Sequence, residues 1–351
     1  MLAPRNFVHF SAASHRFFAS SSLSTVSRLT RDDVQFIPNP NDKYMNAFMK
    51  AHGSDRTVFK KEDISQWKNS FDDDYTFQLM CLKGTTRVIA TTHTCNFRPL
   101  KSSSKPILFM GFGWIDPELR AAGVAKMLNE MCLNMVESTE TNVVSHINQN
   151  GRQFWHLMCG MKELDDVGHG ALEVGYNSFY EAENVRIPKN LDLSGITVNN
   201  AKDVPKKDII DYDQKVHPYH RERYIISHLH DPDGFGKVAY DEDGKVCGIG
   251  QAVIYPAGDC NLGPIYADSP RIAQAMFVHM LQDIAASGKK VTCFEVRSGQ
   301  LAKDSFHWIA PFLTCQPKRH QVSNLVYRNW APKSIDFSKV YSPTHAQLFL
   351  V

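Results

Sequence analysis

The chain has 351 residues, which exceeds the number that a single hydrophobic core usually holds, so its length predicts two domains. Hydrophobic residues make up 43% of the chain and charged residues 22%, the composition of an ordinary globular protein. The formal net charge of +2 gives no electrostatic case for binding nucleic acid or an acidic membrane surface, and no apolar run reaches membrane-spanning length.

The N-terminal segment has the composition of a mitochondrial transit peptide. No acidic residue occurs before residue 31, and Ser, Ala and Phe surround three arginines: Arg5, Arg16 and Arg28. The run Arg16–Ser20 also resembles the site that the matrix processing peptidase cuts. We therefore expect residues 1–31 to lie outside the fold and the protein to reach the mitochondrial matrix. The alternative is a disordered basic tail on a cytoplasmic protein.

The patterns from residue 32 to residue 180 predict one α/β domain. Alternating or continuous apolar runs indicate strands, and apolar residues three or four apart indicate amphipathic helices. In chain order the predicted elements are strand 34–37, helices 44–51 and 64–69, strands 75–82, 87–97 and 107–115, helix 124–135, strand 143–147, helix 152–159 and strands near 161–164 and 172–176.

The stretch from Ile107 to Asn134 carries the most information about function. An apolar strand ends at Asp116-Pro117, and an amphipathic helix begins near Val124. The turn between them is rich in small residues, which let the backbone approach a ligand closely. The first amides of the helix have no partner inside the helix and lie at the positive end of its dipole, so the turn is suited to bind an anion.

In this turn, the spacing Arg120-x-x-Gly123-x-Ala125 after a strand resembles the pyrophosphate loop of the GNAT superfamily of acyl-CoA N-acyltransferases. The turn contains neither the Gly-Lys-Ser/Thr of a Walker A loop nor the Gly-x-Gly-x-x-Gly of a dinucleotide-binding fold. The resemblance implies an α/β fold with a mixed, mostly antiparallel sheet flanked by helices. The alternative is an ordinary strand-to-helix turn whose glycine only permits tight packing.

The resemblance also implies an acyl-CoA site, most simply for acetyl-CoA. In GNAT proteins the strands on either side of the loop and its helix splay apart, and the pantetheine arm lies in the gap. The backbone residues implied to contact pantetheine are Phe112, Gly113, Trp114 and Ile115. The residues whose amides are implied to hold the pyrophosphate are Arg120, Ala121, Ala122, Gly123, Val124 and Ala125.

Direct attack of an amine on the thioester needs a base and an acid for the leaving thiolate. Many GNAT proteins place a tyrosine acid four residues before a Gly-hydrophobic pair, and here the pair Gly160-Met161 puts His156 at that position. An imidazole can serve as this acid because its pKa lies near neutral pH. His146, on the strand beside the expected thioester, is a candidate base. The alternative is that His156 only packs its helix on the sheet.

The second half repeats the element order of the first. Residues 181–195 read as a linker, and residues 196–351 as a second, degenerate GNAT-like domain. Its predicted elements are a strand from Ile196, helices 206–216 and 221–230, strands 237–240, 246–255 and 262–266, helix 270–286, strand 291–296, helix 301–312 and strands near Leu325 and Leu348. The stretch from Gly248 to Pro270 resembles the C-terminal half of the YitH-type acetyltransferases, which are tandem GNAT proteins.

The second half lacks the pyrophosphate spacing, and Asp268 in its turn would repel phosphate. Acyl-CoA is therefore expected in the first half only. Glu295 and Arg297, at the end of a strand, are candidates to bind a polar acceptor, or else they form an interdomain ion pair. No metal site is expected: the eight cysteines contain no C-x-x-C pair. A group of histidines is expected on a solvated helical surface: His217, His220, His228 and His230.

Together these features predict a mitochondrial tandem-GNAT N-acyltransferase that moves an acyl group, most simply acetyl, from CoA to a small amine or amino acid. One alternative is an amino-acid N-acyltransferase of the glycine-conjugating kind that uses longer acyl-CoA. The other alternative is a non-catalytic acyl-CoA sensor or scaffold, which the missing tyrosine favours.

Overall fold

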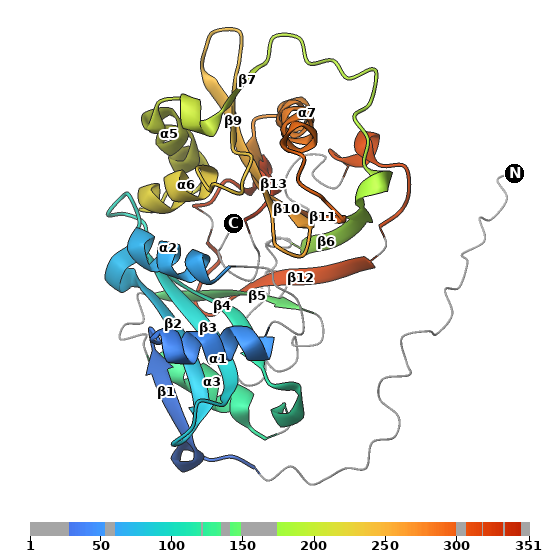
Figure 1. Ribbon diagram of the computed structural model, residues 1–351. Coiled ribbons are helices and arrows are strands. Elements are labelled where there is room, and N and C mark those ends of the chain that lie inside the picture. The colour runs from blue at the N-terminus through green and yellow to red at the C-terminus, as the bar shows by residue number, and fades with distance from the viewer. Residues whose placement is uncertain are drawn as a thin grey trace, which may run out of the picture.

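The computed structural model describes residues 28–52, 60–120, 122–134, 141–148, 174–299, 307–317, 319–332 and 334–344. Ala121, the predicted helix 152–159 with His156, the strand predicted near 161–164 and the strand predicted near Leu348 lie outside these residues. The described chain forms two halves, one above the other in Figure 1, that follow the same order of strands and helices. No helix in this described part is long and apolar enough to cross a membrane.

The first half closely follows the predicted elements. Helices α1 and α2 have acidic residues in their first turns, and α2 buries one apolar face through Ile64, Trp67 and Phe71. Its elements are β1 (Val34–Pro38), α1 (Asp42–His52), α2 (Lys61–Phe71), β2 (Tyr75–Leu82), β3 (Val88–Phe97), β4 (Ile107–Ile115), α3 (Val124–Asn134), β5 (Asn142–Asn148) and β6 (Val174–Glu181).

The second half repeats this order. Its elements are β7 (Thr197–Asn200), α5 (Lys206–Val216), α6 (Glu222–Leu229), β8 (Lys237–Tyr240), β9 (Val246–Ile254), β10 (Asp259–Ala267), α7 (Pro270–Ser287), β11 (Cys293–Gly299), β12 (Arg319–Tyr327) and β13 (Val340–Ser342). A helix was predicted over 301–312. Of this range the structure describes residues 307–312, which form a turn and a short 3₁₀ helix (Ala310–Phe312). Pro311 explains the difference because it has no amide to donate.

The strands of the two halves join in one sheet of 13 strands. The strand order is β1-β2-β3-β4-β5-β12-β6-β11-β10-β9-β8-β7, with β13 beside β10. Strand β12, from the end of the chain, lies antiparallel between β5 and β6, and β6 continues the sheet by pairing with β11. Among the described pairings only β4–β5 and β10–β11 are parallel. Two mixed, mostly antiparallel sheets, one from each half, are thus fused through exchanged strands, as the centre of Figure 1 shows.

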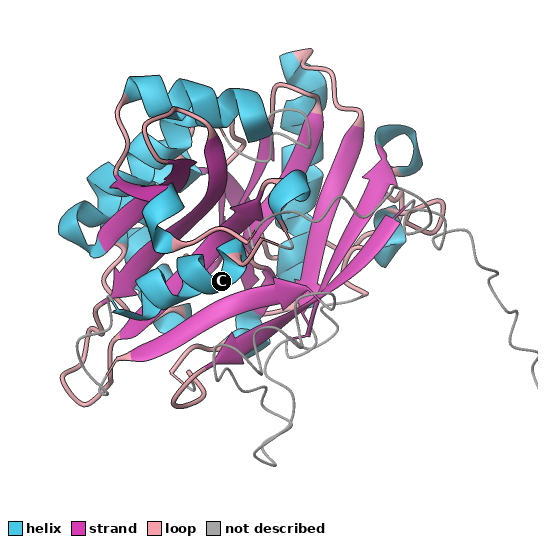
Figure 2. Cartoon of the chain, turned by 90° about the horizontal axis from the view of Figure 1, so that it is seen from below, coloured by secondary structure: helices cyan, strands magenta, loops and turns pink. Residues whose placement is uncertain are grey.

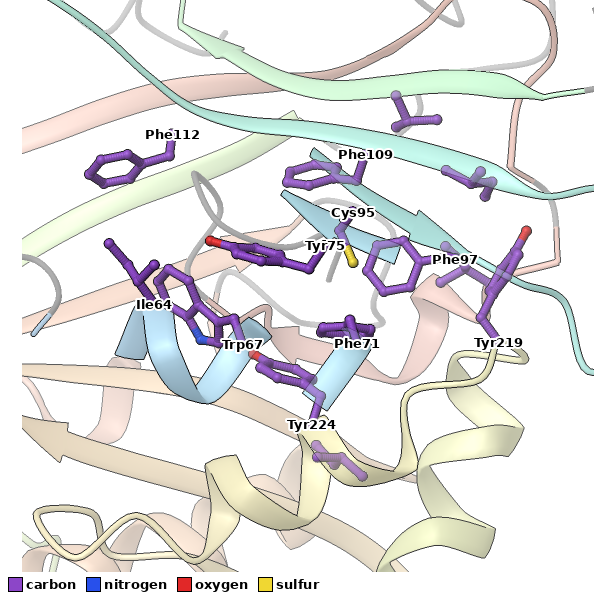
Figure 3. Close-up of a cluster of buried hydrophobic side chains, with 14 of the residues drawn as sticks. Ile64, Trp67, Phe71, Tyr75, Cys95, Phe97, Phe109, Phe112, Tyr219 and Tyr224 are labelled. Carbon is purple, nitrogen blue, oxygen red and sulfur yellow. The ribbon is translucent and has the colours of Figure 1, made fainter. Parts of the chain in front are cut away.

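The helices cover both faces of the sheet, as the view from below in Figure 2 shows. One buried cluster joins α1, α2, α5 and α6 to the same face, and α3 and α7 pack on the other face. In Figure 3, Trp67 and Phe71 of α2 lie between Tyr75 of the sheet and Tyr224 of α6. The rings of Phe71 and Tyr224 stack with centroids 5.5 Å apart, so the first and second halves share one core.

The expectation of a solvated histidine surface is wrong for His217. Its ring is fully buried at the end of α5, 5.2 Å from the ring of Phe97, and burial lowers its pKa well below the usual range. Asp213 is also buried, because it pairs with the buried guanidinium of Arg221. In the described residues no group of side chains has the arrangement of a metal site.

Candidate functional site

Strand β4 separates from β5 halfway along its length. The parallel pairing ends at Met110 and Ser145. Just beyond this point β4 contains a bulge, in which Phe112 has a φ of 53°. This left-handed conformation is rare for a bulky residue, and the Thr91 hydroxyl supports it by donating to the Phe112 carbonyl at 3.2 Å. The remainder of β4 therefore has an edge toward β5 that no described strand occupies.

The residues predicted to contact pantetheine lie on this open part of β4. Gly113 is exposed, and a Cβ added there would meet nothing within 4 Å. Trp114 is half-buried, and its buried Nε1 has no hydrogen-bond partner among the described residues. Both features leave room and a donor for a ligand that lies along the strand.

Two amides at the start of α3 are available to an anion. Asp116 accepts from the Glu118 amide at 3.0 Å, which turns the chain, and the Ala122 amide donates to the Leu119 carbonyl at 3.0 Å. Gly123 follows with a φ of 84°, which glycine adopts without strain. Within the described residues, no hydrogen bond is made by the amides of Gly123 and Val124. No side chain of the described residues caps these amides.

A basic residue that the sequence patterns did not single out lies over this turn. The Leu29 amide donates to the Ala122 carbonyl at 3.1 Å, which fixes the start of the described chain against the loop. The neighbouring Arg28 Nε lies 3.6 Å from the position that a Gly123 Cβ would occupy. Residues 1–31 were expected to lie outside the fold, but Leu29 is bonded to the turn before α3 and Arg31 pairs with Glu130 of α3. Arg28 lies in the segment that resembles a transit peptide, so no sequence pattern indicated its place beside this turn.

Aromatic side chains form one wall of the opening beside β4. The ring of His52, at the end of α1, lies 5.4 Å from Phe112 and 5.9 Å from Trp114. Phe48 of the same helix packs against Phe112 at 5.9 Å. The strained Phe112 is therefore held by packing with α1. No motif in the sequence could have indicated His52, because its neighbours come from strands far along the chain.

Of the two predicted catalytic residues, His146 can be placed. It lies on β5, half-buried, on the sheet face that α1 and α2 cover, and its ring lies 6.1 Å from Phe109 of β4. It follows Ser145, the last residue of β5 that pairs with β4. His146 is thus at the closed end of the opening, where a thioester in the gap would end.

The corresponding opening in the second half is filled by the protein itself. The parallel pairing of β10 with β11 ends at Leu262 and Val296, as in the first half. Strand β13 then pairs with β10 at Ile265 and Tyr266, and the Ser342 hydroxyl donates to the Leu262 carbonyl at 2.6 Å. The backbone edge that a pantetheine would need is therefore already hydrogen-bonded.

The turn before α7 also differs from the turn before α3. Ser269 caps α7 by accepting from the Ile272 amide at 3.4 Å. Asp268 accepts from the Tyr212 hydroxyl at 2.9 Å and pairs with Lys339 at 2.9 Å. A capped helix start beside a carboxylate does not favour phosphate, so the geometry supports the expectation of a single anion turn in the first half.

Glu295 and Arg297 are buried together but lie apart from His146. The Arg297 Nη2 donates to the Glu295 Oε1 at 3.3 Å, and the Asn177 Nδ2 donates to the same oxygen at 2.8 Å. Both residues are on β11, which is three strands from β5 in the sheet. The structure therefore does not bring His146 into contact with Glu295 and Arg297.

Two family models match the sequence. Residues 31–216 match a family described as a protein of unknown function, DUF1248, and residues 209–293 match a GNAT acetyltransferase domain. The second match falls on the half that lacks the pyrophosphate spacing. A search of curated proteins finds no match.

Solved structures resemble the whole described fold. A protein from Pyrococcus horikoshii classed provisionally as an acetyltransferase has a TM-score of 0.61 at 13% identity, with 91% of this chain and 97% of that chain covered. A tandem GNAT protein of the clavulanic acid biosynthesis pathway has a TM-score of 0.58 at 9% identity, with 85% of this chain and 99% of that chain covered. Saccharomyces cerevisiae N-myristoyltransferase with bound myristoyl-CoA has a TM-score of 0.57 at 10% identity, with 90% of this chain and 88% of that chain covered. The fold is that of tandem GNAT proteins.

Proposed function

Because the chain belongs to the family described as a protein of unknown function (DUF1248) and is an acyltransferase of the GNAT type, we propose that its first half binds acyl-CoA and transfers the acyl group to an amine. The amine nitrogen attacks the thioester carbonyl carbon, the carbon–sulfur bond breaks, and the proton lost by the nitrogen is returned to the CoA thiolate. The second half does not bind a second acyl-CoA.

One observation carries this proposal: the open edge of β4 leads directly to the unpaired amides at the start of α3. Gly123 and Val124 offer two donors at the positive end of a helix dipole, and Arg28 adds a guanidinium above them. A pyrophosphate bound there would direct the pantetheine along Gly113 toward His146. The filled edge of β10 explains why the second half has no equivalent site.

Calorimetry of coenzyme A with the purified protein tests this site. We expect the wild type to bind and Gly123→Val to bind at least tenfold more weakly, because a β-branched residue disfavours a φ of 84° and crowds the anion. Gly244→Val is the matched control, since Gly244 has a φ of 72° in a distant hairpin with nothing within 4 Å of an added Cβ. Absence of coenzyme A binding by the wild type would refute the proposal.

We propose His146 as the group that accepts the amine proton, because it lies at the closed end of the opening. His146→Gln should lower kcat by about 10²–10⁴-fold, the usual contribution of a general base. Coenzyme A affinity should stay within twofold of the wild type, since the pyrophosphate turn is untouched. An unchanged kcat would assign the proton transfer elsewhere, with His156 as the remaining predicted residue.

We propose that the acyl chain is acetyl. Longer acyl chains are the alternative, and the yeast neighbour favours them because its structure contains myristoyl-CoA. Thiol release measured with acetyl-CoA, octanoyl-CoA and myristoyl-CoA at one amine concentration ranks the donors. A preference for acetyl-CoA supports the simpler assignment. A preference for a longer chain favours the glycine-conjugating or fatty-acyl kind of transfer. If coenzyme A binds and no thiol is released with any amine, the protein acts as an acyl-CoA sensor.

The composition of residues 1–27 supports a mitochondrial location, which we propose on that ground. The N-terminal residue of the protein purified from mitochondria should lie between positions 17 and 28. This range follows from the arginine at position 16 and from the contacts of Arg28 and Leu29 with the loop. Recovery of the uncut chain in the cytosol would contradict the assignment.

A further inference from the structure

Four polar side chains lie together on one face of the sheet in the second half. We call them the polar floor: Asn177 of β6, Asn261 of β10, and Glu295 and Arg297 of β11. Asn261, Glu295 and Arg297 are 5%, 6% and 3% exposed. Three buried atoms of this group have no hydrogen-bond partner in the described structure: Asn177 Oδ1, Asn261 Oδ1 and Arg297 Nη1. Folded proteins rarely leave buried polar atoms unpaired, so the polar floor is suited to a ligand.

Strand register places the polar floor on the same face as His146. Asn261 lies beside Glu295, and Arg297 lies opposite Asn177. The alternate residues of β10 and β11 pack against α7, so the polar floor is on the face away from α7. Across β12, Gln321 pairs with Asn177 and Leu325 pairs with His146, and these two positions of β12 share that face because they are four residues apart.

The chemistry of the polar floor favours a carboxylate. Glu295 already accepts from Asn177 and Arg297, so its charge is compensated inside the group. The unpaired Nη1 of Arg297 is a charged donor, and a guanidinium binds a carboxylate preferentially. The two unpaired amide oxygens can accept from N–H groups of the same ligand. A molecule with a carboxylate and neighbouring N–H groups would pair all three atoms.

The separation of the polar floor from His146 sets the size of such a ligand. Arg297 and His146 are three strands apart in the sheet and four residues apart along the strand direction. At about 4.8 Å between strands and about 3.3 Å per residue, this separation is about 20 Å across the sheet. A single amino acid cannot cover that length, whereas an extended peptide of about six residues can.

On the basis of the proposed acyltransferase function, we infer that the acceptor is a peptide-length chain. Its terminal amine lies beside His146, and its carboxylate is bound by Arg297 on the polar floor. The second half thus provides the acceptor site for the acyl-CoA site of the first half. The exchange of β12 and β6 gives both sites a common sheet face.

Thiol release from acetyl-CoA with four acceptors tests this inference: glycine, triglycine, hexaglycine and hexaglycine amide. We expect kcat/KM for hexaglycine to exceed that for glycine and triglycine at least tenfold. Hexaglycine amide should lose most of this gain because it lacks the carboxylate. Equal use of glycine and hexaglycine, or equal use of the acid and the amide, overturns the inference.

Arg297 variants test the residue assignment. Arg297→Gln should reduce the acid-to-amide preference to about one, and Arg297→Lys should keep part of it because the charge remains. Arg271→Gln, on an exposed ion pair of α7 with Asp192, is the matched control and should keep the full preference. An unchanged preference in a folded Arg297→Gln protein overturns the assignment. Should that variant not fold, the Arg297→Lys result decides.

The failure of the two proposals can be told apart. If no acceptor releases thiol, the proposed acyltransferase function fails, and calorimetry of hexaglycine with the CoA-loaded protein then tests the polar floor alone. Binding of hexaglycine that is at least tenfold tighter than binding of its amide supports a carboxylate site. Equal or absent binding of both peptides contradicts it.

Discussion

At the scale of single residues, the site depends on backbone conformations that side chains elsewhere hold in place. Phe112 keeps a left-handed φ because Thr91 and the rings of α1 support it, and Gly123 keeps one because it has no Cβ. Phe112 lies just beyond the last paired residue of β4, Met110, and Gly123 lies in the turn where two amides make no hydrogen bond among the described residues. In the proposed site, Arg28 adds a side-chain charge to a turn that otherwise offers backbone groups.

Substitution of Arg28 is expected to weaken coenzyme A binding. Arg28→Gln should raise the Kd about tenfold, since one charge-assisted contact with phosphate corresponds to about 1.4 kcal/mol. Arg31→Gln is the matched control, because Arg31 pairs with Glu130 at 3.2 Å and not with the turn. Calorimetry at two salt concentrations measures the coenzyme A affinity of the wild type and of each variant. Equal affinity of the two variants and the wild type would remove Arg28 from the site.

At the scale of elements, α2 connects the two halves. Its inner face packs on the sheet and on α6, and its first turn contains the buried Asp63. Asp63 accepts from the Lys60 amide at 2.6 Å, yet burial raises the pKa of its carboxyl to about 6. The loss of hydration outweighs the hydrogen bond and the positive charge of Lys60. The start of α2 is therefore more stable with a neutral group at this position.

The raised pKa of Asp63 predicts a pH dependence of stability. Between pH 4 and 6 the unfolded chain loses this proton and the folded chain keeps it, so the free energy of unfolding should fall as pH rises through this window. Asp63→Asn keeps an oxygen for the Lys60 amide and should remove this fall, gaining about 2–3 kcal/mol at pH 7. Urea denaturation at several pH values measures the effect.

Glu62→Gln is the control for this prediction, since Glu62 is the exposed neighbour in the same turn of α2. It should retain the pH dependence of the wild type. A slope that persists in Asp63→Asn would show that another group titrates in this window.

At the scale of the whole molecule, the two halves share one sheet and one hydrophobic core. Strand β12 of the second half completes the sheet of the first half, and the rings of Phe71 and Tyr224 lie in one core. The predicted division into domains 32–180 and 196–351 with linker 181–195 follows the repeat of elements but separates β5 and β6 from β12. Cutting the chain there exposes strand edges and apolar surface.

Separate expression of residues 28–195 and 196–351 should therefore give aggregated or unfolded halves. The intact chain should unfold in one cooperative transition, with coincident curves for circular dichroism and tryptophan fluorescence. Co-expression of the two pieces should restore soluble protein, because β12 can then insert between β5 and β6. Two well-folded separate halves would contradict the shared core.

By itself, the sequence determined the order of the elements, the GNAT-type turn at Gly123 and the lack of such a turn in the second half, because periodicity, turn residues and caps act over a few neighbouring residues. Only the tertiary structure decided the exchange of β12 and β6, the filling of the β10 edge by β13, the burial of His217 and the place of Arg28. These features depend on contacts between residues far apart in the chain, and local pattern carries no record of such contacts. For the same reason Glu295 and His146 were each recognised as candidates, while the two strands that lie between them in the sheet, β12 and β6, were not.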